Sequence, residues 1–298
     1  GETMTQPTTI GVFPNVPEHE YHSWLRLSAS KIKPMAHPTE RELMLPAQYK
    51  LSLEDPFLGS APTLLGSGVH LAVMFPETWE DQIRESAYKT VCAKFFAERA
   101  EAPEKTWLLA GQHDKVSEIQ EAFFKQKGES AERAKMILAN ATEREVSLKF
   151  KLAGEPMKAR IDLVGSDFLA DIKSVGKKGG GSTHSFARHA FDLGYFRQSA
   201  IYCKGAELAG LMKPCEIFYF LIIEVEAPFL INVVAVDPFD RMLGLGQAIQ
   251  YLDKIQECRA SGEWPGYESK CVPVLQHPQW ARDKIENQVA KYLESGKA

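Results

Sequence analysis

The chain has 298 residues, of which 44% are hydrophobic and 25% are charged, and its formal net charge is −4. This length allows one large domain or two small ones, and the negative charge argues against a protein that coats nucleic acid by charge alone. Apolar stretches such as 217–225 are too short to span a bilayer, and no signal-peptide pattern is seen. The five cysteines are scattered, which excludes zinc-ribbon and Cys-x-x-Cys readings and fits the reducing cytoplasm.

The first half of the chain is predicted to be mostly helical, because its apolar residues recur at helical spacing. Proline and serine positions set the expected boundaries. The predicted segments are an irregular arm over 1–20, a short helix near 27–31, a loop over 46–62, a helix over 64–75, and two or three helices within 78–140, of which 112–140 is the clearest.

Beyond residue 140 the apolar pattern changes to the period of two that is typical of strands. Three strands are predicted as a meander over 145–152, 157–164 and 168–175, followed by a glycine-rich loop over 176–181. Later segments are helical sequence over 183–211 with a break near Gly194, two strands over 216–225 and 229–236, and a helix over 238–260. The expected fold class is therefore α/β, with a mixed central sheet flanked by helices. Residues 21–298 are expected to form one domain, with a helical part (21–140), an α/β core (141–262) and a tail (263–298).

Two acids and a lysine stand out on the predicted meander. Strand alternation places Asp171 and Lys173 on one face, and a turn at 165–168 would pair Val164 with Leu169 and bring Asp162 opposite Asp171, with Cβ atoms roughly 5 Å apart. Carboxylates that close repel each other unless a cation lies between them, and Mg²⁺ prefers oxygen ligands. Lys173 would serve as a point charge for a phosphate or a water. The alternative is an exposed hairpin whose charges face water.

The stretch from Arg144 to Lys178 is locally basic. It holds eight basic and five acidic residues, which gives +3, while the whole chain carries −4. Such a stretch can attract a phosphate backbone at short range. A solvated surface is the alternative explanation. The loop over 176–181 is not a P-loop, because no Gly-Lys-Ser/Thr follows a spaced glycine, and we expect it to be mobile and able to grip a strand.

Residues 157–175 resemble the PD-(D/E)xK nuclease superfamily, in which an acid ends one strand and an acid-x-lysine lies on the next. Gly66-Ser67-Gly68-Val69-His70 resembles the helix that supplies a metal-binding histidine in the RecB-like branch. The segment from Gln198 to Tyr202 resembles that branch's Gln-x-x-x-Tyr motif. Motifs at 20–22 with 27–30, and at 263–265 with 280–281, resemble the RecE-like nucleases, so the resemblance runs from about residue 11 to 282.

This resemblance implies roles for individual residues and a restriction-endonuclease-like core. Asp162, Asp171, the carbonyl of Ile172 and His70 would bind the metal, and Lys173 would be the catalytic lysine. Glu145 would bind or position a metal or its water, while Gln198 and Tyr202, four apart on one helical face, would border the site. The alternatives are a structural histidine, a solvated acid and a helix-packing pair. Expected DNA contacts are Ser30, Arg160, Ser174, Lys177 and Lys178.

The function implied by the resemblance is an exodeoxyribonuclease that depends on Mg²⁺, for which Mn²⁺ would substitute. It would digest linear double-stranded DNA, 5′ to 3′, and leave single-stranded tails for phage-type recombination. A single-strand annealing recombinase is the expected partner, and a homo-oligomeric ring the expected assembly. One alternative is a Cas4-like or helicase-associated nuclease, but the cysteine spacing offers no iron–sulfur set. Another is a catalytically degenerate DNA-binding protein of the same fold.

Overall fold

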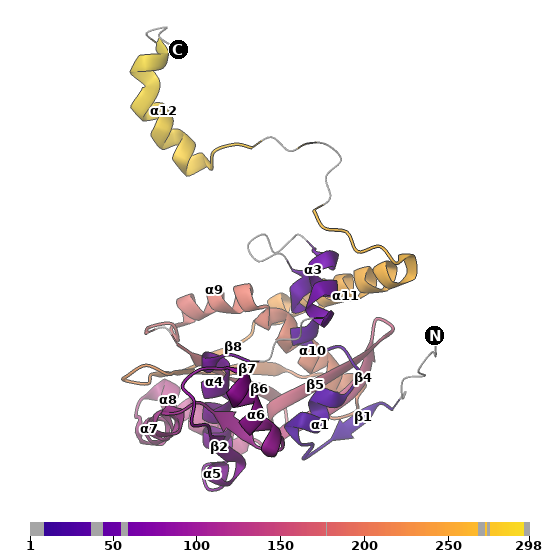
Figure 1. Cartoon of the computed structure of the whole chain (residues 1–298), viewed down its shortest axis with the longest axis vertical. Helices are drawn as coiled ribbons and strands as arrows, with labels where there is room; N and C mark the ends of the chain where they lie inside the picture. Colours follow the sequence, from indigo (N-terminus) through magenta and orange to yellow (C-terminus); the bar gives the residue numbers. More distant parts are fainter. Residues whose placement is uncertain are drawn as a thin grey trace. The chain divides into compact units, whose positions relative to one another are not determined.

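The structure is a computed structural model that describes residues 9–36, 44–54, 59–176, 178–267, 272 and 275–294. The chain divides into two compact units, Gly1–Trp264 and Pro265–Ala298. The first unit contains a six-stranded sheet with helices on both of its faces (Figure 1). In the second, α12 spans Gln279–Glu294. Our assignment of residues 21–298 to one domain stays a prediction.

The sheet has the strand order β1-β4-β5-β6-β7-β8. Its only parallel pair is β6 with β7, and the other neighbours are antiparallel, so the sheet is mixed as predicted. The strands are β1 (Gly11–Phe13), β4 (Glu143–Leu152), β5 (Glu155–Val164), β6 (Phe168–Val175), β7 (Ile217–Glu224) and β8 (Ile231–Ala235). A separate parallel pair joins β2 (Ile83–Glu85) to β3 (Thr106–Leu108).

Two hydrophobic clusters cover the two faces of the sheet. One contains buried residues of α9 (Thr183–Leu193), α10 (Tyr195–Leu208) and α11 (Pro238–Ser261). The other contains buried residues of α4 (Ala61–Met74), α7 (Gln112–Lys125) and α8 (Glu129–Asn140). On β6, Leu169 and Val175 belong to the first cluster and Phe168, Ala170 and Ile172 to the second. This strand is thus apolar on both faces, and its two charged residues lie within a buried setting.

Several short helices complete the first unit. They are α1 (Glu18–Ser23), α2 (Ala29–Ile32), a 3-10 turn over Lys33–Met35, α3 (Pro46–Glu54), α5 (Trp79–Gln82) and α6 (Ala93–Glu101). The side chain of Ser28 caps α2 by accepting the backbone N–H of Lys31, as its sequence predicts. No helix in the part of the chain that the structure describes is long and apolar enough to cross a membrane.

Two segments differ from the sequence predictions. Residues 1–20 were expected to be an irregular arm, yet β1 pairs with β4 at the sheet edge and α1 begins at Glu18. The loop predicted over 46–62 contains α3, which begins at Pro46, and the start of α4. Proline is tolerated in the first helical turn, because a backbone N–H there has no partner within the helix. The prolines in the first turns of α3 and α4 are therefore compatible with helices. Ser60 then caps α4 by accepting the N–H of Thr63.

The helical region over 78–140 holds four helices, where two or three were predicted. The segment predicted as one helix over 112–140 is split into α7 and α8, and Gly128 between them has a φ of 118°. Such a φ lies outside the helical region and is accessible mainly to glycine. The predicted break at Gly194 is present, with a φ of 73° between α9 and α10.

Candidate active site

Both strand ladders around Asp162 are interrupted at that residue. The β4–β5 pairing passes from Arg144↔Leu163 to Val146↔Ile161 and omits Asp162. The β5–β6 pairing keeps the predicted Val164↔Leu169 register but ends at Leu163. The ladder pair of Asp162 with Asp171 that we predicted is therefore not formed. Its place is taken by a contact between the Asp162 side chain and the backbone of β6.

The Asp162 carboxylate is held by groups from two elements. Its Oδ2 accepts the backbone N–H of Ile172 at 2.8 Å and lies 3.5 Å from Nδ1 of His70. Burial raises the pKa of Asp162 well above its ordinary value, and the nearby Asp171 carboxylate raises it further. A cation at this position would relieve the cost of both effects.

On the opposite side of β6, Asp171, Lys173 and Gln198 form a closed polar triangle. Gln198 Nε2 on α10 donates to Asp171 Oδ1 at 2.9 Å, and Lys173 Nζ donates to Gln198 Oε1 at 3.0 Å. Lys173 Nζ also forms an ion pair with Asp171 Oδ2 at 2.5 Å. Burial alone would lower the pKa of Lys173, but the Asp171 carboxylate outweighs it and the pKa is raised. The lysine is thus charged and aimed at Asp171.

His70 reaches this strand because α4 packs closely on it. A Cβ atom at Gly66 would lie 2.7 Å from Ser174 Oγ, and one at Gly68 would lie 2.9 Å from side chains of Leu108 and Val116. Gly66 therefore permits the close approach of α4 to β6, and Gly68 permits close packing of α4 against β3 and α7. Burial lowers the pKa of His70 to about 4. The imidazole is therefore neutral at neutral pH, the form in which histidine binds metals.

The groups that converge here suit a divalent cation. The imidazole of His70 hydrogen-bonds to the backbone of Ile172. In an extended strand the N–H and C=O of one residue point to the same edge, so the Ile172 carbonyl also faces Asp162. Asp171 Oδ2 is buried and is ion-paired with Lys173. Carboxylate and carbonyl oxygens with one imidazole are a donor set that fits Mg²⁺ or Mn²⁺.

This donor set is not arranged as a closed cage. Among the described residues, no group of three or more His, Cys, Asp or Glu side chains is placed so as to hold a metal ion. The ammonium of Lys173 supplies the positive charge beside Asp171 that we had expected from a metal between the acids. The assignment of His70, Asp162, Asp171 and the Ile172 carbonyl as metal ligands stays a prediction.

Glu145 is the residue of β4 that lies beside the interrupted ladder. Its φ is 52°, a left-handed conformation that is costly for a residue with a side chain. Its Oε2 accepts Arg160 Nη2 at 2.9 Å, while Arg160 Nη1 is buried without a hydrogen-bond partner. Backbone strain of this kind tends to occur at functional sites. The ion pair holds the Arg160 guanidinium beside the cleft, which both residues line.

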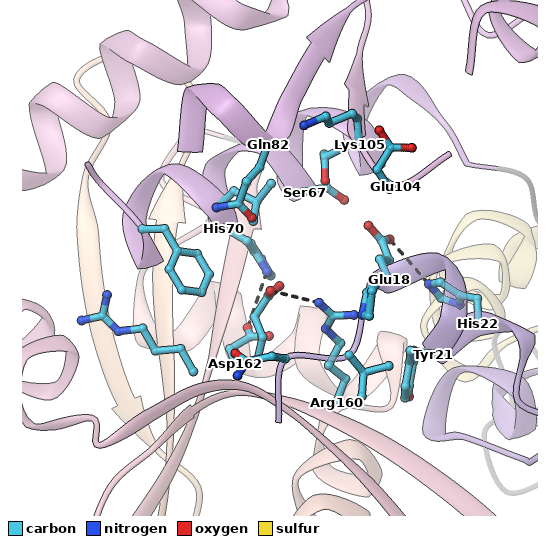
Figure 2. A pocket seen from close by; sticks show the side chains of 18 of the residues that line it. Glu18, Tyr21, His22, Ser67, His70, Gln82, Glu104, Lys105, Arg160 and Asp162 are labelled. Atoms are coloured by element: carbon cyan, nitrogen blue, oxygen red, sulfur yellow. Dashed lines mark hydrogen bonds and ion pairs between the residues drawn. The ribbon is translucent and has the colours of Figure 1, made fainter. Parts of the chain in front are cut away.

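A cleft of about 550 Å³ opens beside Asp162. Figure 2 shows His70, Asp162 and Arg160 along one side, and Glu104 and Lys105 across from them. The sequence-predicted residues that line the cleft are Ser30, His70, Glu145, Arg160, Asp162 and Tyr202. Asp171, Lys173 and Gln198 do not line the cleft, whereas Tyr202, one helical turn after Gln198 on α10, does.

Other predicted DNA contacts lie elsewhere. Ser174 is packed against Gly66 on α4, on the face of β6 opposite Lys173. Lys178 is exposed on the loop after β6. Lys177 lies outside the described residues.

The basic stretch over 144–178 is less available to a ligand than its composition indicates. Lys158 is buried, and its ammonium donates to the carbonyls of Tyr21 (2.7 Å), His22 (3.2 Å) and Trp24 (3.0 Å). Lys149 Nζ lies 3.8 Å from the ring centroid of Trp24. These cations cap the end of α1 and cover an aromatic ring. The expectation that the whole stretch contacts DNA is therefore wrong for Lys149 and Lys158. The sequence does not show which charged side chains make contacts within the protein.

Sequence reasoning missed two acids near the site. Glu18 on α1 lines the cleft, and its Oε1 lies 3.5 Å from His22 Nε2. Hydrogen bonding to His22 lowers the pKa of Glu18. Glu224 on β7 is buried and accepts the backbone N–H groups of Gly179 (3.1 Å) and Gly181 (2.9 Å). The glycine-rich loop that we expected to be mobile is therefore anchored. The sequence signal for this anchor was an acid at the end of an apolar run.

The fold and these residues define the class of protein. An acid on one strand, an acid-x-lysine on the next, and a mixed sheet between two helical layers are the core of the PD-(D/E)xK nuclease superfamily. The chain belongs to the family described as a PDDEXK-like domain of unknown function (DUF3799), whose family model matches residues 28–276. The predicted superfamily and fold class are thereby confirmed, and both support a nuclease.

Comparison with solved structures gives the same fold. A structure named "Putative exonuclease" from Eubacterium rectale aligns over 91% of this chain and 98% of its own, with a TM-score of 0.59 and 16% sequence identity. At this identity the likeness concerns the fold. The structure of SSO0001 aligns over 72% of this chain and 89% of its own at 14% identity, with a TM-score of 0.28, too low to support an argument. No curated protein matches the sequence.

Proposed function

We propose that the protein is a divalent-metal-dependent exodeoxyribonuclease that digests linear double-stranded DNA. The observation that carries this proposal is the arrangement of Asp162, Asp171 and Lys173 around the point where β5 and β6 separate. Buried acids of like charge are costly, and in this fold they are useful when a cation and a phosphate meet them. Mg²⁺ is the proposed ion, and Mn²⁺ would substitute for it.

The chain's own residues would divide the work as follows. His70, Asp162, Asp171 and the Ile172 carbonyl would hold the metal, which supplies Lewis acidity and lowers the pKa of water. Lys173, held by Gln198 and charged, would orient the attacking water or offset charge at the phosphate. Arg160, which lines the cleft, would offer its guanidinium to a phosphate oxygen. Glu145 orients Arg160 through their ion pair.

We further propose that digestion starts from DNA ends and runs 5′ to 3′, leaving single-stranded tails for a phage-type annealing recombinase. A net charge of −4 gives the chain no general attraction to DNA, so a restricted channel would have to confine the substrate. A homo-oligomeric ring would provide such a channel and would admit only a free end. A Cas4-like enzyme is disfavoured, because the spacing of the cysteines offers no four-cysteine set for an iron–sulfur cluster.

The test compares linear duplex DNA with covalently closed circular duplex of the same sequence, at one salt concentration and with Mg²⁺ or EDTA. We expect loss of the linear form only, and only with Mg²⁺. Duplexes labelled at one 5′ or 3′ end then report the polarity. Equal loss of both forms would indicate an endonuclease, and no cleavage under any condition would favour a degenerate DNA-binding protein.

A further inference from the structure

Two cysteines line one small cavity beside α10. Cys203 belongs to α10, and Cys215 lies just before β7, on the segment that connects the two elements. Both are free thiols, and they hydrogen-bond to each other. Cys92 and Cys258 lie on other elements, at the start of α6 and in α11. The contact between Cys203 and Cys215 places two oxidisable sulfur atoms within reach of each other.

Arg241 on α11 spans this pair. Its Nη1 donates to Cys203 Sγ at 3.6 Å, and its Nη2 donates to the Cys215 carbonyl at 3.0 Å. Hydrogen bonding to Cys203 lowers the pKa of Cys215, while the pKa of Cys203 is raised. Cys215 Sγ also donates to the Ile217 carbonyl at 3.2 Å. An adjacent guanidinium favours the thiolate, which is the reactive form of cysteine. Cys215 is therefore the member of the pair that loses its proton more readily.

A small surface cavity reaches the two sulfur atoms. Its volume is about 260 Å³, and both cysteines and Arg241 line it. Cys203 is 8% exposed and Cys215 is 7% exposed. Since a water molecule occupies about 30 Å³ of liquid, the cavity has room for a small oxidant such as hydrogen peroxide.

We propose that Cys203 and Cys215 form a peroxide-reactive dithiol that closes to a disulfide. The Cys215 thiolate attacks one oxygen of a hydroperoxide; the O–O bond breaks, and the leaving hydroxide takes up a proton. Cys215 is then a sulfenic acid, and the Cys203 sulfur attacks it, breaking the S–O bond and releasing water with the Cys203 proton. Two thiols and one H₂O₂ thus give one disulfide and two waters, with peroxide as the oxidant.

Peptide mapping tests this directly, because Lys204 lies between the two cysteines in the sequence. The full chain is treated with one equivalent of H₂O₂, its remaining thiols are alkylated under denaturing conditions, and it is digested with trypsin without reductant. The Lys213–Pro214 bond resists trypsin, so the expected product is peptide 198–204 linked to peptide 205–241, two hydrogens lighter than their sum. Adding a reductant should separate the two peptides.

Serine variants sharpen the result. Cys203→Ser and Cys215→Ser should each abolish the linked product, while Cys92→Ser, which removes a thiol from α6, should leave it unchanged. The wild-type map decides the matter even if a variant fails to fold. Peroxide that converts Cys215 or Cys203 to an unlinked sulfinic acid would overturn the proposal. So would a map in which both remain free thiols while cysteines elsewhere are oxidised.

Discussion

The carboxylate of Asp162 accepts the backbone N–H of Ile172, at the point where β5 stops pairing with β6. This contact replaces a ladder hydrogen bond with one from a side chain, so the backbone of the central strand stays satisfied while the two strands separate. The Ile172 carbonyl and the Asp162 carboxylate are thereby brought to the same opening, beside His70. The separation of the strands, more than their pairing, creates the candidate site.

Asp171→Asn should abolish DNA cleavage, with a loss of about 100-fold or more in kcat, because it removes a metal ligand and the charge that holds Lys173. The fold should persist, since the Asp162 carboxylate still acts on the buried Lys173. Gel assays with Mg²⁺ measure activity, and urea unfolding measures stability. Asp167→Asn, the same substitution at the exposed β5–β6 turn, is the control. Wild-type cleavage by Asp171→Asn would show that the site is misassigned.

Mn²⁺ should raise the melting temperature of the wild-type chain, because an ion that binds only the folded state stabilises it by about 2.7 kcal/mol at a hundredfold excess over its Kd. His70→Ala should weaken this shift, and Asp162→Asn should remove it. His184→Ala, at an exposed position on α9, should behave as wild type. This assay needs no DNA, so it reports metal binding independently of activity. An undiminished shift in His70→Ala would exclude the histidine as a ligand.

Glu224→Gln should release the loop over 176–181. The amide can accept only one of the two N–H groups that the carboxylate accepts, and it turns a donor toward the other. We expect the free energy of unfolding to fall by about 1–3 kcal/mol, and trypsin to cleave faster after Lys178. Glu226→Gln, two residues further along and exposed, provides the comparison. Equal cleavage rates in the two variants would mean that Glu224 does not anchor the loop.

Lys158 gives the stability a specific pH dependence. Burial lowers its pKa to about 8, below the ordinary value of 10.5. Between these values the unfolded chain binds more protons than the folded one, so this group makes stability rise with pH. The carbonyls that accept hydrogen bonds from the ammonium favour its charged form and so raise the pKa. The rise in stability that follows from a pKa of about 8 is therefore the largest rise expected.

The measurement is the difference in unfolding free energy between the wild type and Lys158→Met. From about pH 7.5 to about pH 9.5 it should rise by at most about 2 kcal/mol in favour of the wild type. Lys151→Met, at an exposed position of the neighbouring strand, should show no such trend. A difference that falls as the pH rises would contradict the assignment.

The local sequence determined much of the core. Alternation of apolar and polar residues located β4, β5 and β6, and the bounds of β6 were predicted without error because Phe168–Val175 lies between clear turn signals. The break at Gly194 followed from glycine's freedom at positive φ. Asp162, Asp171 and Lys173 were singled out because charges within apolar strands are costly without a role.

The tertiary structure alone decided how these residues meet. Register arithmetic placed Asp162 opposite Asp171, but the β5–β6 ladder ends before Asp162 and the β4–β5 ladder skips it. The strained Glu145 lies beside this gap, a distortion that no local pattern records. The roles of Lys158 and Glu224 were equally invisible, since each charge is satisfied by backbone groups distant in sequence. Local periodicity reports which face a residue occupies. Which partner neutralises a buried charge depends on chain segments that only folding brings together.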